Sequence, residues 1–242
     1  MISILLKKTL KNLLFKLNLK IEKIYIQNEY NLEPPSMELT KYMSQSRGIL
    51  HIGAHRGSEA PIYEWFGKKV IWIEANPKIF LDLKINTKPY KFQRAICALL
   101  TDKDNTLKKF YISNNDAASS SIYKFGSLSC GEESLWKNKN LNMIDEIKLK
   151  TKTLDKIIDE NDIEIENYDH WVIDVQGAEL AVLQGSKKKI QFCNSLYIEV
   201  SQGDVYKNGS QWIEVKKFLK SKGLSAISNI KSEHENVLFI RK

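Results

Sequence analysis

Two glycines interrupt the sequence directly after a short apolar run, in the segment ILHIGAHRGSEA of residues 49–60. Gly53 and Gly57 stand four residues apart, with His55 between them. A glycine turn between a strand and a helix lets a ligand approach the backbone and lets the helix pack closely on the sheet. We therefore expect the turn to bind a ligand. His55 is a candidate general base, with a local packing role as the alternative.

An acid, Glu74, ends the next apolar run, KKVIWIE, twenty-one residues after Gly53. An acid at this distance, at the tip of the adjacent strand, suits a charge-assisted hydrogen bond to a ribose diol. The turn and the acid together predict a site for an adenosine-bearing cofactor, with Ala75 and Asn76 beside it; a tight turn and a solvated glutamate are the alternative. The spacing G-x-x-x-G does not match the pyrophosphate motif G-x-G-x-x-G. S-adenosylmethionine, which has no pyrophosphate, is therefore favoured over a nicotinamide dinucleotide.

A second polar cluster follows a strongly apolar run, in the segment IDVQGAEL of residues 173–180. Asp174, Gln176 and Glu179 would lie at the end of a central strand, where desolvating carboxylates needs a reason. They are candidates to bind the amino-acid end of the cofactor, to orient substrate or to accept a proton; capping the next helix is the alternative. Glu199 ends the following apolar run, and both a catalytic role and a structural ion pair stay open for it.

The polar loop of residues 113–123 is rich in hydroxyl and amide groups. Such groups can hydrogen-bond a polyhydroxylated acceptor such as a sugar, although a simple polar loop is an equal alternative. The candidates for substrate binding are Asn115, Ser119, Ser120 and Ser121. Asp116, Asp174 and Glu199 carry oxygens that suit a hard cation, but no ligand spacing requires one, and no metal site is predicted.

Short apolar segments alternate with helical patterns from residue 48 onward. This alternation predicts an α/β fold with a mostly parallel sheet, and the last two segments predict an antiparallel edge. The strands are expected at 48–53, 68–77, 91–98, 107–112, 148–153, 171–177, 195–201, 224–230 and 236–241, and the helices at 58–67, 78–87, 154–160, 178–186 and 212–221. Ligands of such sheets bind beyond the carboxyl ends of the strands, so the polar residues after Ile52, Ile73, Ile173 and Ile198 should converge.

The composition fits one large domain with a short extension. The chain has 242 residues, no apolar run long enough to span a bilayer, and three scattered cysteines that favour a reducing compartment over a disulfide framework. Of the net charge of +8, residues 1–26 carry +5, with apolar side chains at a helical period. This segment predicts a helix docked on the domain or a sister subunit, or a membrane-surface helix. We expect an extension over 1–45 and the main domain over 46–242.

The segments HIGAHRGSEA, VIWIEANP, NNDAASSSIY, TLDKIID, VIDVQGAELAVLQG, YIEVS and VLFIRK, taken in order, resemble the FkbM family of S-adenosylmethionine-dependent methyltransferases over residues 46–242. The resemblance implies a Rossmann-like class I methyltransferase fold: a mostly parallel seven-stranded sheet, an antiparallel edge strand and helices on both faces. It also implies that the turn from Gly53 to Gly57 and Glu74 hold the cofactor, and that Asp174 and Glu179 lie beside the transferred methyl group. Many relatives have an acid where this chain has His51, so Glu59 or Asp174 is expected to hold the methionine ammonium.

The resemblance implies O-methylation of a sugar or polyketide-type hydroxyl, and a bacterial cell-surface glycan is the expected acceptor. The expected mechanism is an SN2 transfer with Asp174 as the first candidate base and Glu199 and His55 behind it. A small natural product or a nucleic acid as acceptor, and a non-catalytic binding module, stay as alternatives. Nucleic acid is disfavoured because residues 1–26 carry +5 of the net charge of +8, which leaves the main body close to balanced, and because the chain has DVQG where N-P-P-Y or D-P-P-Y is expected. We expect a cytoplasmic protein, peripheral to the inner face of the membrane, with a homodimer as one option.

Overall fold

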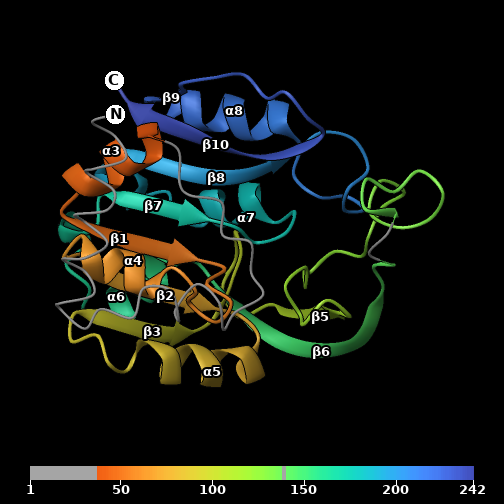
Figure 1. Ribbon diagram of the computed structural model, residues 1–242, viewed down its shortest axis with the longest axis horizontal. Coiled ribbons are helices and arrows are strands. Elements are labelled where there is room, and N and C mark those ends of the chain that lie inside the picture. Colours follow the sequence, from red (N-terminus) through yellow and green to blue (C-terminus); the bar gives the residue numbers. More distant parts are fainter. Residues whose placement is uncertain (1–36, 138–139) are drawn as a thin grey trace, which may run out of the picture. The chain divides into compact units, whose positions relative to one another are not determined.

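A seven-stranded sheet forms the centre of the computed structural model, which describes residues 37–137 and 140–242 (Figure 1). Its strand order is β3-β2-β1-β7-β8-β10-β9. The strands are β1 (Gly48–Ile52), β2 (Lys69–Glu74), β3 (Gln93–Cys97), β7 (His170–Ile173), β8 (Ser195–Ser201), β9 (Leu224–Ala226) and β10 (His234–Arg241). Strand order therefore reverses between β1 and β7, which is the point where ligands bind in open α/β sheets.

The reversed strand of this sheet is β10, which runs antiparallel to both of its neighbours, β8 and β9. The remaining strand pairs are parallel. The expected mostly parallel sheet with an antiparallel strand toward one edge is confirmed. The short strand β9 lies outside β10 and forms the edge itself.

Helices cover both faces of the sheet because side chains alternate along each strand. Ile49 and Trp72 pack in one core with Met43, Tyr63 and Leu83, which come from α3 (Met37–Gln45), α4 (Ala60–Trp65) and α5 (Pro77–Thr87). The opposite core contains Leu50, Ile52 and side chains from α6 (Leu154–Glu160), α7 (Glu179–Gln184) and α8 (Trp212–Ser221). Two short 3-10 helices, Ile165–Asn167 and Ile190–Phe192, precede β7 and β8.

A second, three-stranded sheet lies between β3 and β7 in the sequence. It contains β4 (Leu99–Leu100), β5 (Leu107–Ser113) and β6 (Met143–Lys152), in the order β4-β6-β5. In Figure 1, β5 and β6 lie beyond the carboxyl ends of the parallel strands. This sheet therefore adds a wall to the region where the main sheet is expected to bind its ligand.

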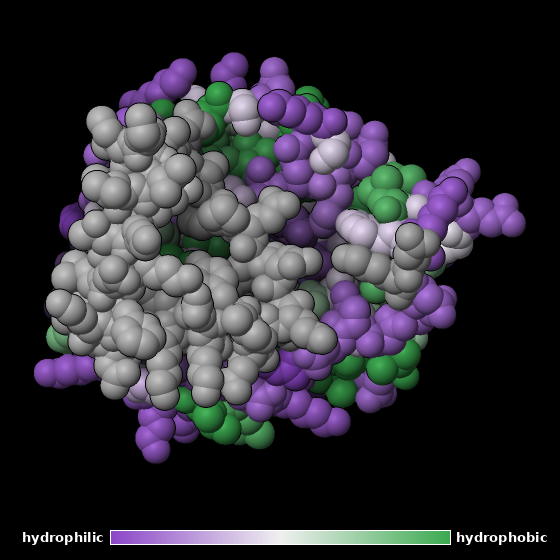
Figure 2. All heavy atoms as spheres, viewed as in Figure 1, coloured by the Kyte–Doolittle hydropathy of each residue, from purple (hydrophilic) through white to green (hydrophobic). Residues whose placement is uncertain are grey.

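The described surface is largely hydrophilic on the face that Figure 2 shows, with separate hydrophobic areas. The described residues include no helix that combines the length and the apolar character needed to cross a membrane. The three cysteines, Cys97, Cys130 and Cys193, are unpaired. The amphipathic helix expected over residues 1–26 lies outside the described residues.

Candidate functional site

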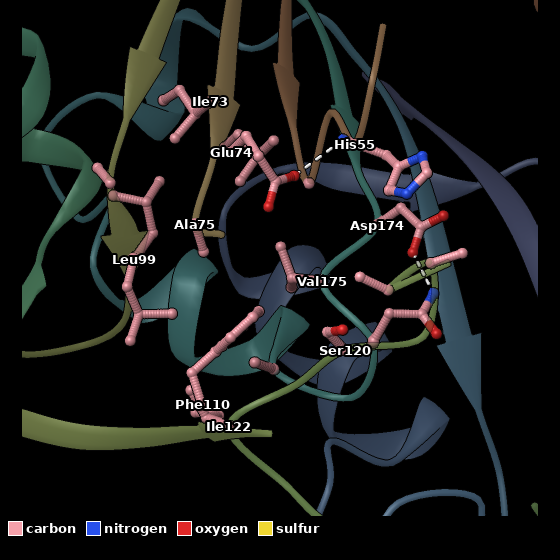
Figure 3. Close-up of a pocket in the computed structure, with 18 residues that line it drawn as sticks. His55, Ile73, Glu74, Ala75, Leu99, Phe110, Ser120, Ile122, Asp174 and Val175 are labelled. Atoms are coloured by element: carbon pink, nitrogen blue, oxygen red, sulfur yellow. Dashed lines mark hydrogen bonds between the residues drawn. The ribbon is translucent and has the colours of Figure 1, made fainter. Parts of the chain in front are cut away.

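A pocket lies at the carboxyl ends of β1, β2 and β7, where the sequence placed the polar residues (Figure 3). It contains about 580 Å³ of space, part of which is open to solvent. Figure 3 shows Glu74, His55 and Asp174 along one side and Leu99, Phe110 and Ile122 along another. The remaining lining residues are Ile52, Gly53, Ile73, Ala75, Ala98, Leu100, Ala117, Ala118, Ser120, Val175, Gln176 and Ala178.

The glycine turn is shaped by contacts within the protein. Gly53 has φ +82°, and a Cβ atom there would lie 1.6 Å from the carbonyl oxygen of Asp174. Gly57 has φ +70°, and its Cβ would lie 2.7 Å from Leu83 Cδ1 on α5. Glycine was predicted here to allow either close packing within the protein or close approach of a ligand. Close packing is visible at both positions. Gly53 and His55 also line the pocket, which keeps this turn a candidate for ligand binding.

Glu74 ties the end of β2 to this turn. Its Oε2 accepts a hydrogen bond from the His55 backbone N at 2.8 Å, and its Oε1 accepts one from the Asn76 backbone N at 2.7 Å. Burial raises the pKa of Glu74 to about 7, against the effect of these amide hydrogen bonds. Ala75 lines the pocket, whereas Asn76 accepts from Lys78 N at 3.1 Å and caps α5.

The acidic cluster, defined as Asp174, Gln176 and Glu199, joins the ends of β7 and β8. The side-chain nitrogen of Gln176 donates to Asp174 Oδ1 at 2.5 Å and to Glu199 Oε2 at 2.7 Å. Burial, followed by the charge of Glu199, raises the pKa of Asp174 well above its usual range. Asp174 and Gln176 line the pocket, and Glu199 lies behind them. The predicted convergence of these strand ends is therefore present.

Two other predicted acids lie outside the pocket lining, and one of them, Glu179, binds the protein's own backbone. Glu179 Oε1 accepts from the backbone N of Gly177 at 2.9 Å and of Val175 at 3.3 Å, and burial raises the pKa of Glu179 to about 7. Glu59 precedes α4 and is not among the pocket-lining residues. Neither carboxyl is placed by the structure against the pocket.

His51, which stands where many relatives have an acid, belongs to the core. Its Nδ1 lies 3.1 Å from the Tyr63 hydroxyl, and its ring stacks on Trp72 with centroids 4.9 Å apart. Burial lowers the pKa of His51, so the neutral ring is favoured in this position.

The polar loop contributes one of its four predicted side chains to the pocket. Ser120 lines it, while Ser121 is buried and donates from Oγ to the Gln176 carbonyl at 2.6 Å. Asn115 and Ser119 bond to each other, with the Asn115 amide nitrogen 2.9 Å from Ser119 Oγ. The loop is held to the glycine turn, because His55 Nε2 lies 2.9 Å from the Asp116 carbonyl.

Several residues of the site were not predicted. Arg56 forms a bidentate ion pair with Asp116. Its Nε forms a single ion pair with Asp82 Oδ2 at 2.9 Å. The Tyr206 hydroxyl donates to Gln176, and His234 pairs with Glu199. Only Arg56 had a sequence signal, as a charged residue inside the glycine turn. The described residues hold no group of three or more His, Cys, Asp or Glu side chains placed to bind a metal.

The strand order, the reversed β10 and the pocket at the β1–β7 switch point define a Rossmann-like class I methyltransferase. The chain belongs to the FkbM methyltransferase family, since the family described as Methyltransferase FkbM domain matches residues 51–225. It is therefore a methyltransferase, and the methyl donor of the family is S-adenosylmethionine.

Comparison with curated proteins gives no significant match. Solved structures of similar fold include magnesium protoporphyrin IX methyltransferase from Synechocystis PCC 6803 with bound SAM, at 9% identity, covering 84% of this chain and 74% of that chain with a TM-score of 0.45. Aeropyrum pernix fibrillarin with natively bound S-adenosyl-L-methionine has 11% identity, coverage of 81% and 68%, and a TM-score of 0.46. A SAM-dependent methyltransferase from Aquifex aeolicus has 11% identity, coverage of 84% and 87%, and a TM-score of 0.44.

Proposed function

We propose that the chain transfers a methyl group from S-adenosylmethionine to a hydroxyl group of a sugar or glycan. The observation that carries this proposal is one pocket, at the switch point of the sheet. It combines Glu74, an apolar wall and the side chains of Asp174 and Gln176 from the acidic cluster, where the apolar wall is Leu99, Phe110 and Ile122. These three features fit, respectively, a ribose, an adenine and the polar reacting centre of a methyl transfer.

The cofactor-binding part of the pocket would be formed by Glu74, the glycine turn and the apolar wall. Each oxygen of a carboxylate can accept more than one hydrogen bond, so Glu74 can hold the turn and a ribose diol together. Leu99, Phe110 and Ile122 offer apolar surface to a flat aromatic base. We assign the amino-acid end of the cofactor to Gly53, His55 and Asp174, which line the same pocket.

The bound cofactor supplies a methyl group that is already activated by its sulfonium charge. Asp174 would accept the proton of the acceptor hydroxyl, because it is the carboxyl of the acidic cluster that lines the pocket. The burial that raises the pKa of Asp174 makes its ionised form a stronger base. The sulfonium charge of the bound cofactor would favour that ionised form. His55 is a second candidate: its Nε2–H donates to the Asp116 carbonyl at 2.9 Å, which leaves Nδ1 of the neutral ring as the nitrogen that can accept a proton.

A neutral polyhydroxylated acceptor is favoured by the electrostatics of the site. Burial and the charge of Glu199 raise the pKa of both Asp174 and Glu179, and such a group of carboxyls, once ionised, repels an anionic acceptor such as a nucleic-acid backbone. Ser120 adds a hydroxyl to the same pocket. We further propose a cell-surface glycan as acceptor, a cytoplasmic location with membrane-surface contact through residues 1–26, a domain boundary near residue 45, and a homodimer as one option for assembly.

Cofactor binding is tested by titration calorimetry with S-adenosylhomocysteine. Wild type should bind, and Glu74→Ala should bind about 10- to 100-fold more weakly, because a hydrogen bond to a charged group contributes about 1.5–3 kcal/mol. Glu64→Ala, an exposed glutamate on α4, is the matched control. Absence of binding in wild type, or equal affinity in wild type and Glu74→Ala, would contradict the assignment.

Since Glu74 also holds the glycine turn, a second variant is needed. Ala118→Trp places a large ring in the pocket from an exposed loop position and should also block binding. Circular dichroism establishes that both variants are folded. The acceptor is then sought with methyl-labelled S-adenosylmethionine and a panel of glycans and nucleotide sugars, in which labelling of nucleic acid alone would contradict the sugar proposal.

A further inference from the structure

A series of side-chain contacts connects the pocket with strand β10. Gln176 contacts Glu199 Oε2, and the other carboxylate oxygen of Glu199 lies 2.8 Å from Nε2 of His234. His234 Nδ1 lies 2.8 Å from the hydroxyl of Ser201. His234 is not among the pocket-lining residues, so it reaches the pocket through Glu199 and Gln176.

The nitrogen and the oxygen of the Gln176 side-chain amide both have hydrogen-bond partners. A primary amide has two N–H donors, and those of Gln176 point to Asp174 and Glu199. Its oxygen accepts from the Tyr206 hydroxyl, and its backbone, at φ +56°, is held by Ser121. Gln176 therefore sets the orientation of the two carboxyls relative to each other, and a group that fixes Glu199 also fixes Asp174.

His234 brings a positive charge to a group of acids. The titratable side chains that act on it come from other elements: Glu199 in β8, which it contacts, and Glu179 in α7. Asp174 and Tyr206 act on the same two acids, since their charges or hydrogen bonds involve Glu199 and Glu179. The side chains of His234 and Glu199 are 14% and 11% exposed. Burial lowers the pKa of His234, but the hydrogen bond and charge of Glu199 and the charge of Glu179 raise it overall above its ordinary value.

The surroundings of His234 allow its charge to change without loss of geometry. The Trp136 ring packs edge-on against the imidazole, with centroids 5.3 Å apart. The Ser201 hydroxyl can accept from a charged imidazole and donate to a neutral one. Titration of His234 would therefore alter the field at the acidic cluster while the contact with Glu199 is kept.

We propose that His234 is a positioning residue for methyl transfer: it holds Glu199 and, through Gln176, fixes the carboxyl of Asp174 at the pocket. The inference rests on the proposed function, in which Asp174 is the base. A positive charge on His234 favours the ionised form of Asp174, so it extends the active pH range toward acid. Loss of that charge moves the acid limb of the pH profile to higher pH.

The kinetic test compares wild type with His234→Gln and His234→Ala, using methyl-labelled donor and the acceptor found in the screen. Glutamine keeps a neutral donor near the Nε2 position, whereas alanine removes both donor and charge. We expect kcat at pH 7 to fall about 10-fold in His234→Gln and about 100-fold in His234→Ala. The acid limb should move up by about one pH unit in both variants. KM for the donor should rise by a smaller factor than kcat falls, because His234 lies outside the pocket lining and reaches the cofactor only through Asp174.

A second readout is independent of turnover. The imidazole of His234 is titrated by NMR in the full-length protein, alone and with Glu199→Gln. The wild-type midpoint should lie above 6.5, and Glu199→Gln should lower it by about one pH unit or more. Affinity for S-adenosylhomocysteine should stay within about threefold of wild type in Glu64→Ala, and any loss in the His234 variants should be smaller than the loss in Glu74→Ala.

An unchanged pH profile in folded His234→Ala, or an unmoved His234 titration in Glu199→Gln, would overturn the inference. If His234→Ala does not fold, His234→Gln and Ser201→Ala give the comparison, with a smaller shift in the same direction expected for Ser201→Ala. Failure of wild type to bind S-adenosylhomocysteine would overturn the proposed function instead, while the NMR titration still decides whether His234 and Glu199 form a pair.

Discussion

At the scale of single residues, the polar groups of the pocket serve the backbone and the ligand site together. Glu74 accepts from two backbone amides, and its position fixes where the glycine turn lies relative to β2. Gln176 likewise holds two carboxyls, while its own carbonyl is bound by Ser121. On the proposed function, a substitution at such a residue would affect local structure and ligand binding at once, so its test needs a second variant that changes only one of the two.

Three glycines with positive φ allow a graded test of why the turn after β1 needs glycine at positions 53 and 57. Gly53, Gly57 and Gly67 all have positive φ, but an added Cβ would meet a backbone oxygen at Gly53, a flexible side-chain end at Gly57 and nothing within 4 Å at Gly67. We expect Gly67→Ala to lower the free energy of unfolding by about 1–2 kcal/mol, from the left-handed conformation alone. Gly57→Ala should cost somewhat more, about 2–3 kcal/mol, and Gly53→Ala should prevent stable folding. Chemical denaturation measures the order, and equal losses at Gly53 and Gly67 would contradict it.

At the scale of elements, the sequence predicted best where burial imposes a pattern. The strands β1, β2 and β8 were predicted because each is a short, nearly continuous apolar run that the sheet buries on both faces. The helix α8 was predicted because its apolar side chains recur at helical spacing. The first part of β6 was missed. Its residues 143–147 are mostly exposed and are held by pairing with β5, which leaves no apolar period in the sequence.

Some residues of the candidate functional site could likewise be predicted from the sequence, and others could not. The polar residues at the ends of β2, β7 and β8 could be predicted, since carboxyl ends of parallel strands meet at one edge of a sheet. The roles of Tyr206 and His234 could not. They depend on how a loop and an antiparallel strand, distant in sequence, return to the acidic cluster.

The loop of residues 113–121 is held by His55 and Ser121, and its position should also depend on the ion pairs of Arg56. Asp116 and Ala117 both have positive φ, a conformation that costs about 1–2 kcal/mol per residue, so the loop needs an anchor. Arg56 supplies one by pairing with Asp116 and with Asp82 on α5. Arg56→Ala should speed hydrogen exchange at the amides of Ala117 and Ala118 and speed dissociation of S-adenosylhomocysteine several-fold. Global stability should change by no more than about 1 kcal/mol.

The control for this variant is Lys109→Ala, which removes an exposed ion pair with Glu146 on the β5–β6 hairpin. Exchange at Ala117 and Ala118 should be unchanged in Lys109→Ala. If both variants exchange alike in this loop, Arg56 is not one of its anchors.

At the scale of the whole molecule, residues 37–242 form one compact unit, and its site draws on most of the unit's length. The pocket is lined from Ile52 to Ala178, and its acidic cluster is supported by His234 in the penultimate strand of the sheet. Removal of a terminal element that packs away from the strand ends should therefore lower the stability of the fold while the pocket still binds its ligand.

Helix α3 is such an element, and its removal gives the last prediction. Met43 is 3% exposed in the core on the α4 and α5 face, and Lys68 Nζ donates to the carbonyls of Ser44 at 2.8 Å and Ser46 at 2.6 Å.

A chain of residues 46–242 loses the buried methionine and the Ser44 carbonyl, whereas a chain of residues 37–242 keeps both. We expect the shorter chain to be less stable by about 2–4 kcal/mol in denaturant unfolding. Met43→Ala in the full-length protein should account for about 2 kcal/mol of this loss. Both truncated chains should still bind S-adenosylhomocysteine under native conditions, since no residue of α3 lines the pocket. Equal stability of the two chains would place the domain boundary at residue 46, and a large stability gap would place it at residue 37.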